Sequence, residues 1–176
     1  MSMRSLVLAG AGLAVTTLHA QEGPGLGVEI SARDLAPWDI SIEADGSGLP
    51  PGSGDVASGA SLYAEKCMAC HGEKGAGQPN DRLVGGHGTL KDLNQVRTIG
   101  SYWPYASTVF DYIRRAMPFT TPQSLTDDEV YSLTAYLLYL NGIVDEGAVM
   151  NARTLAEVEM PNRDGFVLSY PRPEAD

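Results

Sequence analysis

The spacing of apolar and polar residues predicts three helices. The first begins at Asp55, a favourable N-cap residue, and runs to about Cys70. The second covers about Ser107 to Ala116, where apolar residues recur at intervals of three and four. The third follows Thr126-Asp127-Asp128-Glu129, a capping box, and ends at Asn141-Gly142, a stop signal. Together these patterns predict an all-α domain over residues 55–142.

Both flanks of this domain lack a comparable pattern. Residues 21–54 are rich in Gly and Pro, which predicts an extended N-terminal arm with many turns. Residues 143–176 form a C-terminal extension with a short helix expected near Thr154–Val158. Inside the domain, residues 72–104 contain seven glycines and predict loops that wrap tightly.

Residues 1–20 have the features of an export signal. Arg4 supplies a positive start, residues 6–18 are an apolar run, and Leu18-His19-Ala20 is a plausible cleavage site. The run is short for a bilayer span of about 20 residues, although an uncleaved anchor remains the alternative. We expect a signal peptide, a mature chain without a membrane span, and a periplasmic location.

Acidic residues outnumber basic ones. The chain has 22 Asp and Glu against 12 Lys and Arg, a net charge of −10. This balance makes nucleic acid a poor partner, because binding to phosphates needs a basic surface.

Candidate chemistry lies at the end of the first predicted helix. Cys67-Met68-Ala69-Cys70-His71 is a C-x-x-C-H box, the attachment signature of a c-type haem. Each thiol can add to a haem vinyl group, and the adjacent histidine can bind the iron. A zinc site would need further ligands, and a redox dithiol normally follows a strand. The box therefore predicts one covalent haem c, with iron bound by His71.

The second iron ligand decides between electron transfer and ligand chemistry. Met117 is our prediction, because it follows an amphipathic helix that Pro118 ends, so its side chain can project inward. His87, in Gly85-Gly86-His87-Gly88, is the alternative for bis-histidine ligation, and an open position is a third.

Further residues are candidates for contact with the haem. Arg97 offers a bidentate fork to a propionate, and Trp103 and Tyr105 offer apolar rings with one polar atom each. Ordinary packing in a loop explains them equally well. Residues 66–115 carry seven basic and four acidic side chains. These cations either form a ring around the haem edge on which a partner docks, or neutralise propionates and lie on solvated faces.

The order of these features resembles the class I cytochrome c fold, in which helices wrap one covalent haem and the first and last helices cross. Gly59 and Tyr63 on the first helix, with Leu133 and Tyr136 on the third, occupy the positions expected for that crossing. Over about residues 37–168 the chain also resembles a narrower family, the cytochrome subunit of Sox sulfur dehydrogenase and related sulfite dehydrogenases, in its first haem domain only. The stretches that carry this likeness are Trp38-Asp39-Ile40, residues 45–54, residues 100–107, residues 110–119 and residues 136–142.

The resemblance implies an electron-transfer role without catalytic residues of its own. Cys67, Cys70, His71 and Met117 would hold the haem. Electrons would arrive from a molybdenum-containing sulfite or sulfur dehydrogenase and leave to another cytochrome or an oxidase. The alternatives are a haem enzyme of thiosulfate-oxidising or peroxidase type, a haem-based sensor or structural subunit, and a general electron shuttle unrelated to sulfur.

Overall fold

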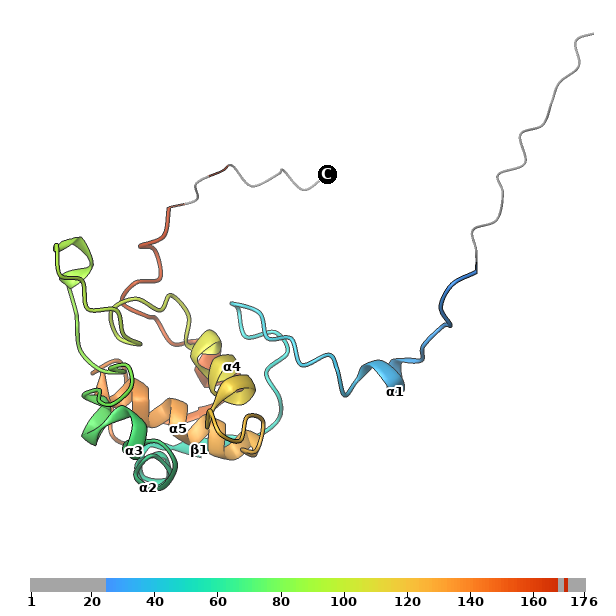
Figure 1. Ribbon diagram of the computed structural model, residues 1–176, viewed down its shortest axis with the longest axis horizontal. Coiled ribbons are helices and arrows are strands. Elements are labelled where there is room, and N and C mark those ends of the chain that lie inside the picture. Colours follow the sequence, from blue (N-terminus) through green and yellow to red (C-terminus); the bar gives the residue numbers. More distant parts are fainter. Residues whose placement is uncertain (1–24, 168–169, 171–176) are drawn as a thin grey trace, which may run out of the picture. The chain divides into compact units, whose positions relative to one another are not determined.

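The computed structural model describes residues 25–167 and Tyr170, which fall into two units (Figure 1). The first unit ends at Trp38, and its described part contains helix α1, Ala32–Leu35, which begins with a Ser31–Asp34 capping box. The second unit runs from Asp39 and contains every predicted site residue. The predicted export signal, residues 1–20, lies outside the described residues.

The three longest helices described in the second unit correspond to the three that the sequence predicts. They are α2, Val56–Lys66; α4, Ala106–Ala116; and α5, Asp127–Leu140. Asp55 caps α2 by accepting a hydrogen bond from the Ser58 N–H at 2.7 Å. The first predicted helix is interrupted at Cys67, where φ is −125° and ψ is −35°, and resumes as the short helix α3, Met68–His71. The all-α class and the class I cytochrome c fold are confirmed.

The crossing of α2 and α5 is very close at Gly59. A Cβ atom there would overlap the carbonyl oxygen of Ser132 and would lie 2.7 Å from the Cβ of Tyr136. One turn later the rings of Tyr63 and Tyr136 pack with their centroids 5.5 Å apart. Tyr63 is buried, and its hydroxyl donates to the Gly72 carbonyl at 2.9 Å. The crossing therefore ties the end of α2 to the chain that follows α3.

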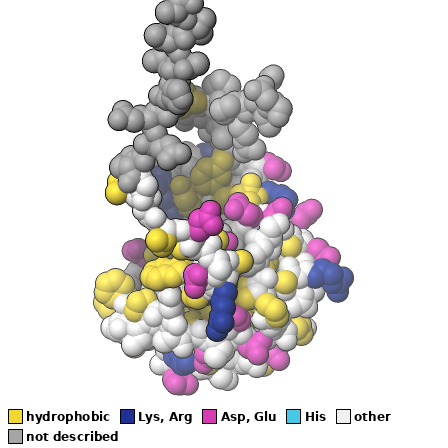
Figure 2. All heavy atoms as spheres, turned by 90° about the vertical axis from the view of Figure 1, so that its right-hand side faces the viewer, with side chains coloured by type: hydrophobic (Ala, Val, Ile, Leu, Met, Phe, Trp, Pro, Cys, Tyr) yellow, Lys and Arg dark blue, Asp and Glu magenta, His cyan; other side chains and the backbone are white. Residues whose placement is uncertain are grey.

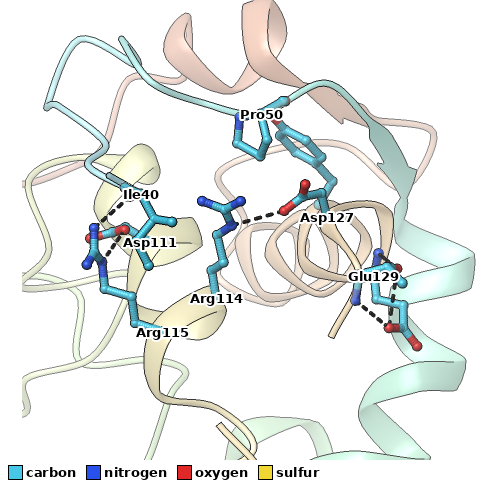
Figure 3. Close-up of polar contacts among 9 residues, drawn as sticks. Ile40, Pro50, Asp111, Arg114, Arg115, Asp127 and Glu129 are labelled. Carbon is cyan, nitrogen blue, oxygen red and sulfur yellow. Dashed lines mark hydrogen bonds and ion pairs between the residues drawn. The ribbon is translucent and has the colours of Figure 1, made fainter. Parts of the chain in front are cut away.

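Two ion pairs attach the first turn of α5 to its neighbours. Glu129 closes the capping box on Thr126 and also accepts a hydrogen bond from Lys66 of α2 at 2.7 Å. Asp127 pairs with Arg114 of α4 at 3.0 Å, while Arg115 pairs with Asp111 at 2.6 Å (Figure 3). The start of α5 is thus fixed to both helices that carry predicted haem ligands at their ends.

Replacing Glu129 by glutamine should lower stability at neutral pH. The hydrogen bond from Lys66, followed by that from the Thr126 N–H, lowers the pKa of Glu129 below its ordinary 4.5. A carboxyl group of this kind stabilises the fold above its unfolded pKa and loses that contribution as pH falls through its folded pKa. We expect Glu129→Gln to cost roughly 1 kcal/mol at pH 7, the size of a cap with an exposed ion pair.

Urea unfolding between pH 7 and pH 3 checks this, since the difference between the two proteins should shrink as the medium becomes acid. Glu146→Gln, at an exposed position, is the matched control. A difference that stays constant across that range would contradict the role of ionised Glu129.

Strands and a third short helix complete the core. Strand β1, Ser53–Asp55, pairs antiparallel with β2, Val149–Asn151, with Gly54 opposite Met150. Helix α6, Ala152–Ala156, lies slightly before the helix expected near Thr154–Val158. Met150, Leu155 and Met160 are all at least 96% buried. Residues 149–160 therefore cover the core and do not form a loose tail.

The long loop between α3 and α4 contains only two 3₁₀ turns, η1, Glu73–Gly75, and η2, Thr89–Lys91. None of the helices in the described part of the chain is long and apolar enough to cross a membrane. The face shown in Figure 2 carries acidic side chains in many places and basic side chains in few, as expected from the composition.

Candidate functional site

A cavity of about 620 Å³ lies among α2, α3, α4, α5 and the long loop. This volume falls within the range of roughly 300–1,000 Å³ that is common for ligand and cofactor sites. Aliphatic side chains from α4, α5 and the long loop line it: Leu83, Ile99, Val109, Ile113, Leu133 and Leu137. The cavity suits a large apolar molecule.

The two cysteines of the C-x-x-C-H box both line this cavity, and both thiols are free. Cys67 is the residue at which the helix breaks, and Cys70 lies in α3. Burial raises the pKa of the Cys67 thiol to about 11. Attacking thiols of redox dithiols have a lowered pKa, in the range of about 3.5–7.5, so this environment disfavours the dithiol alternative.

His71 also lines the cavity, and its ring orientation is fixed by the loop. Its Nδ1 lies 2.9 Å from the backbone carbonyl oxygen of Asp81. Because a carbonyl can only accept, Nδ1 is the donor in this contact, and the neutral ring then has its free lone pair on Nε2. A backbone partner of this kind orients histidines that bind metals. The ring is therefore prepared to act as a ligand through Nε2.

Met117 reaches the same cavity from α4. It is the C-cap residue of that helix, and its extended backbone, with φ −118° and ψ 146°, turns the chain away from the helix axis. His87, the alternative ligand, is exposed and is not among the described residues that line the cavity. Within the described part of the chain no three His, Cys, Asp or Glu residues converge as a metal site, so the zinc alternative has no ligand set there.

Of the three other residues predicted to contact the haem, two line the cavity. Arg97 and Trp103 line the cavity, whereas Tyr105 does not. Tyr105 is instead the N-cap residue of α4, and the guanidinium carbon of Arg163 lies 5.8 Å from its ring centroid. The Arg97 guanidinium donates to Gln95 Oε1 at 3.1 and 2.9 Å and pairs with no carboxylate of the described chain. Its charge is therefore available to an anionic group in the cavity.

Asn141 is a buried residue whose function in the site the sequence did not reveal. Its Oδ1 accepts from the Gly85 N–H at 3.1 Å, while its Nδ2 donates to the carbonyls of Leu83 at 3.2 Å and Leu137 at 2.8 Å. One side chain thus ends α5 and holds Leu83 of the loop against the cavity. The signal in the sequence, Asn141-Gly142, indicated only the end of a helix.

Asn141→Ala should loosen this wall of the cavity. The Gly85 N–H loses its acceptor, whereas the carbonyls of Leu83 and Leu137 keep the N–H groups of Ile99 and residue 141 as donors. A buried polar group left unpaired costs about 1–3 kcal/mol. Thermal unfolding should show the loss, and hydrogen exchange should show faster exchange at Gly85. Asn94→Ala, at an exposed position of the same loop, should leave both unchanged. Equal behaviour of the two variants would contradict an anchoring role for Asn141.

The donor set fits one known cofactor. Two free thiols, an imidazole with Nε2 free and a thioether open into a single apolar cavity. Two vinyl groups and an iron with two axial positions match these four side chains. A helix that ends in this box, crossed by a later helix at a glycine, defines a c-type cytochrome domain.

Comparisons with known proteins give the same class. Residues 54–137 match the family described as cytochrome c oxidase, cbb3-type, subunit III. The fold is similar to a chain in the crystal structure of the sulfane dehydrogenase SoxCD from Paracoccus pantotrophus, with a TM-score of 0.78 and 46% identity, over 85% of this chain and 73% of that one. The chain belongs to the cytochrome c family, which implies haem c, with its iron, as the cofactor.

Two curated relatives are thiosulfate dehydrogenases. The one from Stutzerimonas stutzeri (strain A1501) is 31% identical over 90 residues, which is 50% of this chain and 28% of the relative. The one from Psychrobacter arcticus is 31% identical over 115 residues, 59% of this chain and 32% of the relative. The chain therefore spans less than a third of the length of these relatives.

Proposed function

We propose that this chain is a periplasmic electron carrier with one covalent haem c, which accepts single electrons from a molybdenum-containing sulfur or sulfite dehydrogenase and passes them to another cytochrome or an oxidase. The observation that carries the proposal is the convergence of Cys67, Cys70, His71 and Met117 on one apolar cavity. The 46% identity to a SoxCD chain supports the choice of donor.

Each of the four side chains has a distinct task in this proposal. Cys67 and Cys70 would hold the cofactor through thioether bonds, which would keep it in place in either redox state. His71 and Met117 would bind the iron, which would keep substrate from the metal. When bound, the haem supplies an iron that takes up and releases one electron.

The cavity walls support transfer of an electron and disfavour chemistry at the iron. Leu83, Ile99, Leu133 and other aliphatic residues line the cavity and would shield a bound haem from water. A surrounding of low polarity favours the ferrous haem, which carries less charge than the ferric haem, and a thioether ligand also favours the ferrous state. Both effects raise the reduction potential and suit an acceptor of electrons from a sulfur dehydrogenase.

The test has two parts. Haem that stays with the polypeptide through extraction with acid acetone would support covalent attachment. Stopped-flow mixing should then show faster reduction by sulfite with a sulfite dehydrogenase than by an unrelated dehydrogenase with its own substrate. Equal rates would remove the assignment of the donor and leave a general electron shuttle.

Thiosulfate oxidation by the chain itself is the second candidate, because two thiosulfate dehydrogenases are among its relatives. It requires an iron position that exchanges its ligand. Reduction of the isolated ferric protein by thiosulfate alone, with tetrathionate as product, would favour this candidate. No reduction without a partner enzyme would favour the carrier.

A further inference from the structure

The segment after α6 lies against the loop that carries Arg97 and Trp103. We call residues 160–166 the C-terminal strap. Its first residue, Met160, is 96% buried, which anchors it to the core. Hydrogen bonds from Arg163 N to the Met160 carbonyl and from Gly165 N to the Asn162 carbonyl, both 3.1 Å, fold it into two consecutive turns. The strap is therefore an ordered part of the domain (Figure 1).

Three contacts join the strap to the loop. Asn162 Nδ2 donates to the Tyr102 carbonyl at 2.7 Å, and the ring of Phe166 meets the ring of Tyr102 edge-on with centroids 5.3 Å apart. The guanidinium carbon of Arg163 lies 5.8 Å from the Tyr105 ring centroid. The strap thus holds Tyr102 by its backbone and by its ring.

Tyr102 in turn touches Arg97. The guanidinium carbon of Arg97 lies 5.2 Å from the Tyr102 ring centroid, on a ring that Phe166 meets from the strap. The Tyr102 N–H also donates to the Thr98 carbonyl at 2.9 Å, which closes a turn directly after Arg97. A chain of contacts therefore runs from Phe166 through Tyr102 to Arg97, which lines the cavity.

We propose that the C-terminal strap positions the Arg97 guanidinium at the cavity through Tyr102 and thereby helps to set the reduction potential of the site. This inference rests on the proposed function, since the potential is that of the bound haem c. Arg97 is a cation without a carboxylate partner in the described chain, and Gln95 binds only one edge of its fork. A fixed cation beside the cofactor favours the reduced, less positive iron.

The strap acts as a positioning element and does not itself line the cavity. Losing the Phe166 ring leaves Tyr102 free to rotate, and Arg97 then loses its stacking partner. A cation–π contact at a partly exposed site corresponds to roughly a two- to fivefold change in an equilibrium constant. We therefore expect Phe166→Ala to shift the redox equilibrium between the haem protein and a mediator of fixed potential by this factor, toward the oxidised haem.

Four holoprotein variants test the inference as a double-mutant cycle: Phe166→Ala, Arg97→Ala, the two combined, and Phe166→Tyr. Phe166→Ala should lower the potential, and Phe166→Tyr, which keeps the aromatic edge, should restore it. In the Arg97→Ala background the effect of Phe166→Ala should vanish, because the guanidinium it positions is gone. Val167→Ala, at a side chain that is 92% exposed, is the control for substitution in this segment.

The possible outcomes distinguish failure of this inference from failure of the proposed function. An unchanged potential in Phe166→Ala, or an equal shift in both backgrounds, would overturn the inference and would leave the carrier function intact. Unsubstituted protein that carries no covalent haem would overturn the proposed function and this inference with it. Haem content, measured in the same preparations, separates the two cases, and thermal unfolding of each variant shows whether a shift accompanies loss of folding.

Discussion

Alanine at Gly59 should destabilise the domain by roughly 2 kcal/mol, although alanine is ordinarily the better residue inside a helix. The Cβ atom would overlap the Ser132 carbonyl oxygen and lie 2.6 Å from the carbonyl carbon and 2.7 Å from the Tyr136 Cβ. None of these atoms is the end of a flexible side chain, so α2 and α5 would have to move apart. Overpacking costs about 1–3 kcal/mol and sometimes more, whereas the gain in helix propensity is only about 1 kcal/mol.

Urea unfolding at constant pH measures this effect. Gly147→Ala is the matched control, because a Cβ there would meet nothing within 4 Å. We expect the control to unfold like the unsubstituted protein and Gly59→Ala to unfold at much lower urea. Stability of Gly59→Ala equal to that of the control would mean that the two helices do not approach as closely as the structure has them.

The three long helices were predictable because their signals are local. Asp55 and the Thr126–Glu129 capping box mark the starts of α2 and α5, and the structure confirms both caps. The break at Cys67 was not predictable. The apolar pattern continues through the box and carries no sign of the interruption.

The β1–β2 ladder was missed for a different reason. Each strand has three residues, too few for a period of two to appear, and the strands come from opposite ends of the domain. Their pairing depends on the close approach of Gly54 to α5, where a Cβ would overlap Ser132. Such contacts exist only after α5 has packed, so the sequence of either strand alone does not encode them.

The site residues also divide into those with a signal in the sequence and those without one. The C-x-x-C-H box, Met117, Arg97 and Trp103 carry chemical signals, and the structure brings all of them to one cavity. Leu83 and Ile99 line it too, but they are single apolar residues in a glycine-rich loop without periodicity. Tyr105 had the same aromatic signal as Trp103 and lies outside the cavity lining, since residue type does not determine the direction of a side chain in a loop.

The basic segment between residues 66 and 115 serves several purposes. Lys66, Arg114 and Arg115 form ion pairs with Glu129, Asp127 and Asp111. Arg82 and Arg97 line the cavity. Pairing inside the fold thus uses cations that a docking ring would need, which favours a structural function for much of the positive charge.

Replacing Met117 by alanine should have the largest effect on the chemistry of the site. Under the proposed ligation, the iron loses its thioether and gains an open position. A thioether stabilises the ferrous form, so the reduction potential should fall, by a substantial part of the roughly 0.8 V that axial ligands span. The ferric protein should also bind imidazole or cyanide rapidly, and the ferrous protein carbon monoxide, which the unsubstituted protein should resist.

Met68→Ala is the matched control, because Met68 lies within the C-x-x-C-H box and its side chain is 41% exposed. Its potential and ligand binding should equal those of the unsubstituted protein.

Met117→His adds a second comparison. An imidazole should close the iron position again while leaving the potential low, because imidazole favours the ferrous iron less than a thioether does. An unchanged spectrum and potential in Met117→Ala would transfer the ligand function to another residue. The cavity would then have to rearrange to admit it, since His87 is not among the residues that line it.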